Sequence, residues 1–410
     1  MSNYKNAINA LYLYRNGYIE TLNKERRNTI IGNSFLSRLK TILFSFFKEF
    51  KLLLFHQNLQ IDIEDKIVCI VNSKNNYEAL KFLRDSDVVF LKATVLGNSM
   101  ENVITHRFKS KFFFSILFFV SLPFIIINKQ NRRDLYLLYR AYGLNSLFTK
   151  LVQKQKPKLV VFANDHIPET RSYILACQKM GIKTAYIQHG SVSTYFPPLE
   201  FDLALLESKY SEASYKKSKN IDTEIKLIGM PKLDSEISKI RQRNQIKKIG
   251  IAINQNDDLN KVENIISSLI KNNFKVILRK HPADVRKIKS NFKIENGNNM
   301  SVFDFISHSD FLVASDSSIH VEANSVKCRS VYYQFHDNNS KYDYYGFVKN
   351  KFVDEVKNAS ELIELVGNFN YKTFNFNTPE ISYYNEALKS NIYGKSSILA
   401  KKYIYESINS

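Results

Sequence analysis

The sequence predicts an α/β protein made of two doubly wound domains with a cleft between them. From residue 66 onward, short apolar runs rich in β-branched residues alternate with helical stretches, which is typical of parallel strands buried on both faces of a sheet. A polar and basic stretch, residues 235–248, interrupts this alternation, which then restarts. A chain of 410 residues also suits two domains better than one core.

Each half of the chain has its own series of predicted strands. In the first half they are expected at residues 66–71, 88–93, 159–163, 183–188, 203–206 and 225–228, with helices at 76–84, 133–155 and 167–180. In the second half they are expected at 249–253, 275–278, 311–314 and 330–333, with helices at 261–272, 302–309 and 319–326. We therefore expect a first domain over residues 66–240, a second over 241–375, a basic N-terminal region over 1–65 that belongs to the first domain, and a C-terminal helical segment over 376–410 that packs back.

The chain carries 59 Lys and Arg against 39 Asp and Glu, a net charge of +20. This excess predicts an anionic partner, which could be a nucleic acid, a membrane surface or a phosphorylated substrate. No RNP aromatic motif, GXXG loop or zinc-finger spacing accompanies it, so a non-enzymatic nucleic-acid-binding protein is the weakest hypothesis. Cys69, Cys177 and Cys328 lie far apart, which argues against a disulfide scaffold or zinc site and indicates a reducing cytoplasm.

Two apolar segments bear on contact with a membrane. Residues 112–127 carry no charge, but this length reaches only about 24 Å as a helix and Pro123 would kink it, so no membrane span is expected. Residues 35–55 mix Phe and Leu with Lys and Arg, and they are either an amphipathic element on anionic lipid or a helix packed on the first domain. The global charge favours the first interpretation, and hence a cytoplasmic protein held peripherally at the inner face of the plasma membrane.

Two polar motifs follow neighbouring predicted strands of the second domain. Strand 275–278 runs into Arg279-Lys280-His281-Pro282, which projects an imidazole and two cations at the edge where open α/β sheets bind ligands. Strand 311–314 runs into Ser315-Asp316-Ser317-Ser318 directly before a helix, where hydroxyl and free N–H groups favour an anion. The residues expected to form a nucleotide-phosphate pocket are Lys280, His281, Pro282, Ser317 and Ser318.

Two carboxylates lie close to these motifs in the sequence. Asp304 opens the helix at 302–309, and it either accepts hydrogen bonds from ribose hydroxyls or stabilises the first turn of that helix. Glu322 lies one turn after the serines and is expected to be a solvated helix carboxylate rather than a ligand contact.

Titratable groups also follow two strands of the first domain. Strand 159–163 ends in Asn164-Asp165-His166, and strand 183–188 ends in His189-Gly190. Transfer of a group to a hydroxyl needs a base that takes its proton, a role that suits aspartate or histidine. The candidate catalytic residues are therefore Asp165, His166 and His189. Helix capping by Asp165 and a hydrogen-bonded turn at His189 are the structural alternatives.

These motifs resemble those of bacterial glycosyltransferases that use cytidine nucleotides and have two Rossmann-like domains, the GT-B architecture. His281-Pro282 with Ser317-Ser318 is similar to the HP and SS motifs of sialyltransferases. The motifs that resemble the CDP-glycerol and CDP-ribitol polymerases of teichoic acid synthesis are His189-Gly190, Gly229–Asp234, Arg279–Pro282 and Ser315–Ser318. Capsule Kdo transferases share the general layout, and the resemblance covers roughly residues 158–335.

The resemblance implies roles for single residues. His281 and the serines would contact the cytidine nucleotide, an acid such as Asp304 would hold its ribose, and Asp165 or His189 would act as the base. The sequence departs from the sialyltransferases in carrying Asn164-Asp165-His166 where they have paired acids and a glycine.

The activity expected on this basis is transfer of a nonulosonic acid from a CMP-sugar donor to a hydroxyl of a bacterial surface glycan. The sugar would be of the sialic, pseudaminic, legionaminic or Kdo type, and the acceptor a glycan of capsule polysaccharide or lipopolysaccharide, free or linked to lipid. The alternative is a CDP-polyol phosphotransferase, which would share the pocket. No cofactor and no metal are expected, because fixed cations and hydroxyls can offset the charge of leaving CMP. The one DxD, Asp85-Ser86-Asp87, precedes its strand, which is the wrong end for a metal–nucleotide site.

Overall fold

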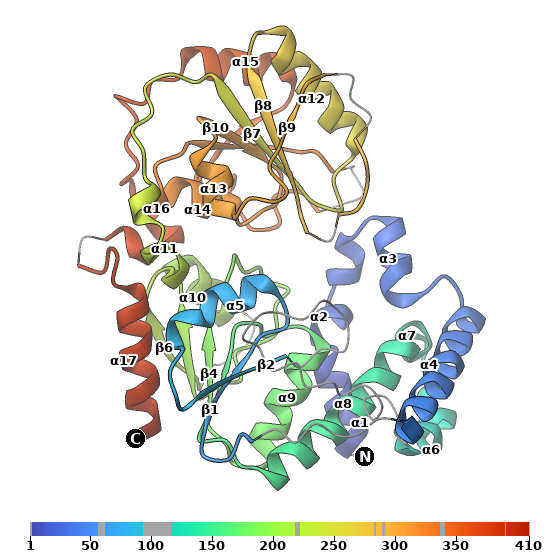
Figure 1. The fold of residues 1–410 in the computed structure, drawn as a ribbon. Helices are drawn as coiled ribbons and strands as arrows, with labels where there is room; N and C mark the ends of the chain where they lie inside the picture. Colours follow the sequence, from blue (N-terminus) through green and yellow to red (C-terminus); the bar gives the residue numbers. More distant parts are fainter. Residues whose placement is uncertain are drawn as a thin grey trace.

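Two parallel sheets of six strands each form the frame of the protein in the computed structural model (Figure 1). The structure describes residues 2–55, 62–92, 116–217, 222–282, 284–288, 292–336, 341–389 and 391–409. Neighbouring strands within each sheet pair in parallel. The predicted fold class, two Rossmann-like doubly wound domains, is confirmed.

The first sheet has the strand order β2-β1-β3-β4-β5-β6. Its strands are β1 (Ile67–Ile70), β2 (Val88–Leu91), β3 (Leu159–Phe162), β4 (Thr184–Ile187), β5 (Leu203–Leu206) and β6 (Glu224–Leu227). On one face, the apolar cluster includes side chains of α8 (Leu135–Lys154), α9 (Pro168–Lys179) and α10 (Lys209–Lys216). On the other face it includes side chains of α5 (Lys74–Leu80), η2 (Lys81–Leu83) and α17 (Ser396–Asn409). Helices on both faces explain why four of these strands are continuous apolar runs.

The second sheet has the order β12-β11-β10-β7-β8-β9. Its strands are β7 (Lys248–Ile253), β8 (Lys275–Lys280), β9 (Glu295–Asn296), β10 (Phe311–Ala314), β11 (Ser330–Tyr333) and β12 (Asp354–Val356). Helices α12 (Leu259–Lys271) and α15 (Ala359–Asn368) cover one face, and α13 (Val302–Ser307) and α14 (Ile319–Ser325) cover the other. Strands β9 and β12 have no counterpart among the predicted strands, because runs this short leave no readable periodicity.

The N-terminal region and residues 116–133 form a helical layer beside the first sheet (Figure 1). Its elements are α1 (Ser2–Ala10), α2 (Tyr12–Arg15), η1 (Tyr18–Thr21), α3 (Lys24–Ile31), α4 (Phe35–Phe55), α6 (Ile116–Ile125) and α7 (Lys129–Arg133). Their buried side chains join those of α8 in one apolar cluster. None of the helices in the described ranges is long and apolar enough to cross a membrane. Residues 112–115 of the predicted apolar segment lie outside the described residues.

The C-terminal segment returns from the second sheet to the first. Side chains of α16 (Pro379–Tyr384) and η4 (Glu386–Leu388) belong to an apolar cluster of the second sheet. Ala400 and Ile404 of α17 are buried in the cluster on one face of the first sheet. The end of the chain therefore contacts both domains.

Arginine side chains hold the polar segment 235–248 against the second domain. The segment follows α11 (Pro231–Asp234) and contains a single 3₁₀ turn, η3 (Ile237–Lys239). Arg243 is 4% exposed, and its guanidinium donates hydrogen bonds to the carbonyl groups of Ile306, Ser309, Val326 and Lys327. A segment predicted to be a linker is therefore docked, because one guanidinium can satisfy several backbone carbonyls at once.

We expect Arg243→Ala to lower the free energy of unfolding by about 3 kcal/mol, because it leaves several buried carbonyl groups without donors. Chemical denaturation monitored by circular dichroism measures this loss. Gln242→Ala is the matched control, since Gln242 is exposed in the same segment. Equal stability of the two variants would show that the arginine does not hold the segment.

Candidate active site

The carboxyl ends of the two sheets meet at a direct contact between two predicted site loops. The N–H group of Ser191, in the loop after β4, donates a hydrogen bond to Ser318 Oγ at the start of α14, at 2.9 Å. Gly190 allows this approach, because a Cβ at that position would lie 3.2 Å from Ser318 Oγ. The motifs that follow β4 and β10, in different domains, therefore belong to one site.

Asp165 and His166 form a hydrogen-bonded pair directly after β3. Asp165 is 1% exposed, and its carboxylate accepts hydrogen bonds from His166 Nδ1 at 2.9 Å and from the hydroxyl of Tyr215 at 2.6 Å. The side chain of His166 is 19% exposed, and its ring lies 4.4 Å from the ring of Phe196. Both oxygens of Asp165 are engaged and buried, so His166, whose Nε2 lies 3.4 Å from the side-chain amide of Asn164, is the more exposed member of the pair. Asp165 can orient its ring.

Asn164 holds the turn directly before α9, whose N-cap residue, Ile167, has no side-chain cap, so the alternative of helix capping by Asp165 is wrong. Asn164 Oδ1 accepts hydrogen bonds from the N–H groups of His166 at 3.1 Å and Ile167 at 3.0 Å, directly before α9. The carboxylate of Asp165 is thereby left for the side chains of His166 and Tyr215.

His189 follows β4, the strand that pairs with β3, so the two groups of titratable residues follow adjacent strands of the first sheet. Burial of the ring, together with the nearby His166 and Lys232, lowers the pKa of His189 to about 3. The imidazole is therefore neutral at pH 7 and binds a proton only weakly. The carbonyl oxygen of His189 accepts a hydrogen bond from Lys232 Nζ at 3.2 Å, which fixes the loop before Gly190.

Three charged residues that were not predicted as site residues cluster at the same place. Lys232, in α11, forms an ion pair of 2.5 Å with Glu322 of α14. Glu322 is 7% exposed, so the expectation of a solvated carboxylate is wrong. Glu207 directly follows β5, and its burial raises its pKa to about 7 although the charge of Lys232 opposes this shift. Within the described part of the chain, Glu207 Oε1 has no hydrogen-bond partner. The sequence could have indicated Glu207 as a site residue, because it is a polar residue directly after a buried strand.

Gly229 explains how Lys232 reaches this cluster. Its φ is +74°, and a Cβ there would lie 2.4 Å from the Cβ of Ala387 in η4. Only glycine allows the chain to turn this closely against η4. Pro231 then begins α11, which carries Lys232 toward Glu322.

The two cations at the end of β8, Arg279 and Lys280, are arranged differently from the prediction. Arg279 donates hydrogen bonds to the carbonyl groups of Gly297 at 3.0 Å and Met300 at 2.5 Å. Lys280 Nζ donates to the carbonyl group of Arg286 at 2.6 Å. Both side chains therefore hold neighbouring loops, and phosphate binding by Lys280 stays a prediction.

His281 marks the end of β8. Its N–H group donates to the carbonyl of Ile253 at 2.8 Å, and Pro282 lies in a turn closed by the N–H of Asp284 on the carbonyl of His281 at 2.7 Å. His281 is exposed, yet desolvation of its ring and the charges of Arg26 and Arg279 lower its pKa, against the effect of Asp284. Arg26 belongs to α3, so the N-terminal region reaches the second domain beside this motif.

The motif after β10 has an inner and an outer part. Ser315 is buried, and its hydroxyl donates to Asp257 Oδ1 at 2.6 Å. Ser317 Oγ accepts a hydrogen bond from the N–H of Ile319 at 3.3 Å, and Ser318 Oγ accepts the one from the first domain. Both outer hydroxyls also carry a proton that can be donated to a ligand oxygen.

His281 and these serines do not follow adjacent strands, contrary to the prediction, because β7 lies between β8 and β10. Two strand intervals separate the motifs by about 10 Å. The difference arises because the first strand of this domain takes a central place in the sheet. Asn254 follows β7, and its side-chain amide lies 3.4 Å from Ser315 Oγ, so it occupies the interval between the motifs.

Asp304 and Ser301 cap α13 reciprocally. The N–H of Asp304 donates to Ser301 Oγ at 3.1 Å, and the hydroxyl of Ser301 donates to Asp304 Oδ2 at 2.6 Å. The stabilising role in the first turn is therefore confirmed, and contact with a ribose stays a prediction.

Comparisons with known proteins find similarity in fold alone. No protein-family model and no curated protein match the chain. Wall teichoic acid polymerase TagF superposes with a TM-score of 0.51 and 14% identity over 91% of this chain and 96% of that one. UDP-N-acetylglucosamine 2-epimerase from Rickettsia bellii superposes with a TM-score of 0.52 and 11% identity, over 84% of this chain and 97% of that one. UDP-GlcNAc 2-epimerase from Neisseria meningitidis bound to UDP-GlcNAc superposes with a TM-score of 0.51 and 13% identity, over 83% of this chain and 100% of that one. The chain has a GT-B-like two-domain fold, distantly similar to these enzymes.

We expect Glu207→Gln to stabilise the protein more at pH 8 than at pH 5. The pKa of Glu207 is about 7 in the folded chain, and about 4.3 is usual for an unfolded chain. As the pH rises from 5, the unfolded chain releases the Glu207 proton while the folded chain still holds it, so the wild type loses stability until the buried group ionises as well. Glutamine removes this loss, on the order of 2 kcal/mol. Urea denaturation at several pH values measures the difference. Glu364→Gln, at an exposed position of α15, is the control; a difference that does not change with pH would contradict the assignment.

Proposed function

We propose that this protein transfers a phosphopolyol group from a CDP-polyol donor, of the CDP-glycerol or CDP-ribitol class, to a hydroxyl group of an acceptor polymer. One observation carries the proposal: three of the four motifs that resemble the polymerases of teichoic acid synthesis, His189-Gly190, Gly229–Asp234 and Ser315–Ser318, lie around one contact between the two domains. Ser191, next to His189-Gly190, bonds Ser318, and Lys232 bonds both His189 and Glu322. The similarity in fold to TagF over 91% of the chain supports the same class of reaction.

This alternative has more support than transfer of a nonulosonic acid from a CMP-sugar. The sialyltransferase resemblance uses only His281-Pro282 and Ser317-Ser318, whose strands are separated by β7. The polymerase resemblance also includes Gly229–Asp234, which carries Lys232 into the inter-domain ion pair. The CMP-sugar reaction remains the second candidate, because the HP and SS residues serve either donor.

The second domain would bind the donor. The hydroxyl groups of Ser317 and Ser318 and the imidazole of His281 would donate hydrogen bonds to the diphosphate oxygens, with Pro282 and Lys280 shaping the loop behind them. Asp304 would accept hydrogen bonds from the ribose once its carboxylate no longer bonds the hydroxyl of Ser301. Neutral donors and the fixed charge of Lys232 would stabilise the departing cytidine monophosphate.

The first domain would remove the proton. His166, oriented by Asp165, would take the proton from the hydroxyl group of the acceptor polymer. The oxygen of that hydroxyl group would attack the β-phosphorus of the donor at the same time. A new P–O bond forms to the acceptor, and the bond from that phosphorus to the bridging oxygen breaks, which releases CMP. His189, neutral and less basic, would line the attacking side.

The reaction would take place in the cytoplasm, at the inner face of a membrane. An acceptor polymer carried on a lipid would meet the protein there, and α4 and α6 provide the surface considered in the next subsection. We expect no nucleic acid among its partners.

We expect CDP-glycerol or CDP-ribitol to release CMP in the presence of a suitable polyol-phosphate acceptor, with full turnover in EDTA. We expect metal independence because fixed hydrogen-bond donors and cations of the site could offset the charge of the leaving CMP. Chromatographic detection of released nucleotide measures turnover. Release from CMP-sialic acid or CMP-Kdo, with none from the CDP-polyols, would select the second candidate instead. A strict requirement for Mn²⁺ would overturn the metal-free scheme.

We expect His166→Ala to lower kcat by about 10² or more while leaving nucleotide binding intact, because the base does not touch the donor. Asp165→Asn would lower kcat less and shift the pH–rate profile, since it acts through the orientation of His166. The rise in melting temperature on adding CDP measures binding, and His281→Ala should reduce that rise. His308→Ala, an exposed histidine of the second domain, is the control. If His189→Ala stops turnover and His166→Ala does not, His189 is the base.

A further inference from the structure

Helices α4 and α6 are apolar on the side that faces away from the protein. Within the described residues, ten of the fourteen exposed large apolar side chains lie on these two helices or directly after α6. They are between 46% and 77% exposed. We call them the apolar face: Leu36, Leu43, Phe44, Phe47, Phe50, Ile116, Leu117, Val120, Phe124 and Ile127. A helix that only packs on a globular domain turns polar residues to the solvent, so packing alone does not explain this face.

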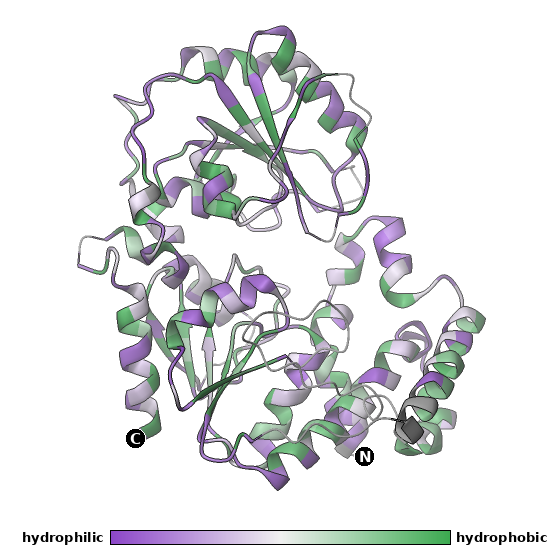
Figure 2. Ribbon diagram, in the orientation of Figure 1, coloured by the Kyte–Doolittle hydropathy of each residue, from purple (hydrophilic) through white to green (hydrophobic). Residues whose placement is uncertain are grey.

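The outer sides of the two helices form one surface. Phe46 of α4 contacts Phe119 of α6, with ring centroids 5.4 Å apart. On their inner sides, Ile42 and Phe118 are buried in the cluster shared with α8. Both helices lie at the edge of the molecule, away from the sheets, and carry the hydrophobic colour of Figure 2 along much of their length. Soluble monomers rarely leave a contiguous apolar surface of this kind uncovered.

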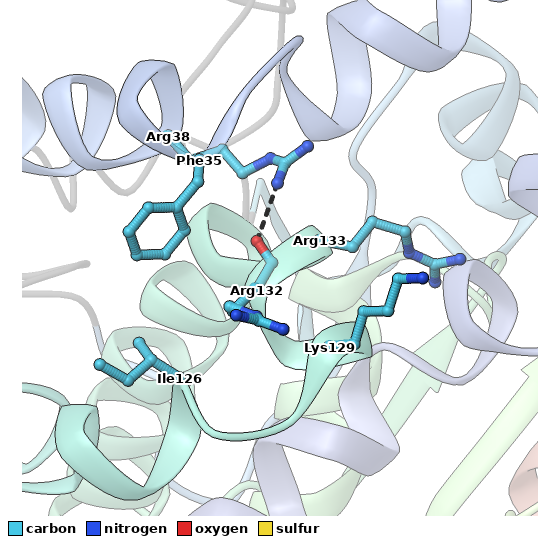
Figure 3. A pocket seen from close by; sticks show the side chains of 6 residues that line it. All are labelled: Phe35, Arg38, Ile126, Lys129, Arg132 and Arg133. Atoms are coloured by element: carbon cyan, nitrogen blue, oxygen red, sulfur yellow. Dashed lines mark hydrogen bonds between the residues drawn. The ribbon is translucent and has the colours of Figure 1, made fainter.

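A basic pocket opens beside the apolar face. It has a volume of about 590 Å³ and lies between α4 and the segment from Ile126 to Arg133 (Figure 3). The residues lining it are Phe35, Arg38, Ile126, Lys129, Arg132 and Arg133. Four cations and two apolar side chains thus surround one opening.

Most of this positive charge is not neutralised by carboxylates. Arg133 pairs with Glu20 and Asp134. Arg38 instead donates hydrogen bonds to neutral carbonyl groups, including that of Arg132 at 3.0 Å. Lys129 and Arg132 are exposed, and their side chains have no ion pair with any residue in the described ranges. The pocket therefore presents positive charge suited to a phosphate group.

We propose that this surface docks on a bilayer that contains anionic phospholipid, with the apolar face entering the interface and the basic pocket holding a lipid phosphate. Apolar side chains beside uncompensated cations are the combination that an anionic membrane surface satisfies. A second copy of this chain would bring the same cations face to face, and an apolar protein partner would leave the pocket without a counter-charge. Lys40 and Lys48, exposed on α4, add to the positive charge of the same face.

Docking does not depend on the proposed transferase reaction, so its test uses the full chain without nucleotide. Flotation with vesicles of phosphatidylcholine, alone or mixed with phosphatidylglycerol, measures partition into the membrane. We expect the protein to bind the anionic vesicles. Its partition into vesicles of phosphatidylcholine alone should be weaker by a factor of roughly ten or more, and its binding to the anionic vesicles should decline at high salt. The double variant Phe44→Glu with Phe124→Glu should lose binding to both kinds of vesicle. Lys129→Glu with Arg132→Glu should lose only the preference for the anionic lipid.

The controls are exposed apolar residues elsewhere, Val285→Glu and Ile398→Glu, which should bind vesicles as the wild type does. An unchanged melting temperature shows that the variants fold, and an unchanged shift with CDP separates loss of docking from loss of the nucleotide site. Two results would overturn the proposal. One is that the protein binds neutral and anionic vesicles equally well, or binds neither. The other is a concentration-dependent dimer in sedimentation that disappears with Phe44→Glu, which would assign the face to a second copy.

Discussion

The buried ion pair between Lys232 and Glu322 is the interaction on which the geometry of the candidate site depends. It joins α11, which follows the first sheet, to α14 of the second, and its side chains are 14% and 9% exposed. Removing one partner of such a pair leaves an uncompensated buried charge, which costs about 3–5 kcal/mol. Since Lys232 also bonds the carbonyl of His189, the same contact sets the loop in which Gly190 and Ser191 meet Ser318. These contacts thus hold the two domains together where the loops of the candidate site lie.

In the proposed reaction, the two domains would contribute different kinds of chemical group. The first domain would contribute His166, which is partly exposed beside the carboxylate of Asp165, and His189, whose pKa is lowered by burial and neighbouring positive charge. The second domain contributes hydroxyl and N–H groups that donate without titrating. A reaction that moves one proton while a charged group departs needs both kinds of residue at one edge.

The large positive charge of the chain has more than one role. Arg243, Arg279 and Lys280 bond backbone carbonyl groups and hold loops and a linker in place. Lys129 and Arg132 lie instead on an exposed surface next to apolar side chains. Net charge alone therefore says little about the partner, because a buried arginine and an exposed lysine count equally in the composition.

The sequence alone determined the fold class, most of the strands and the edge at which the candidate site lies. Apolar runs buried on both faces identify parallel strands, and polar residues directly after them, such as Asp165, His189 and Ser317, fall at the carboxyl edge whatever the order of the strands. The tertiary structure decided which of these residues meet. The central place of β7 separates His281 from the serines, and His166 is more exposed than Asp165, its buried partner. Lys232, Glu207 and Glu322 come to lie beside the candidate site through contacts distant in sequence. Periodicity records which side of an element is buried, but the order of strands and the pairing of charges arise only when separate segments pack together.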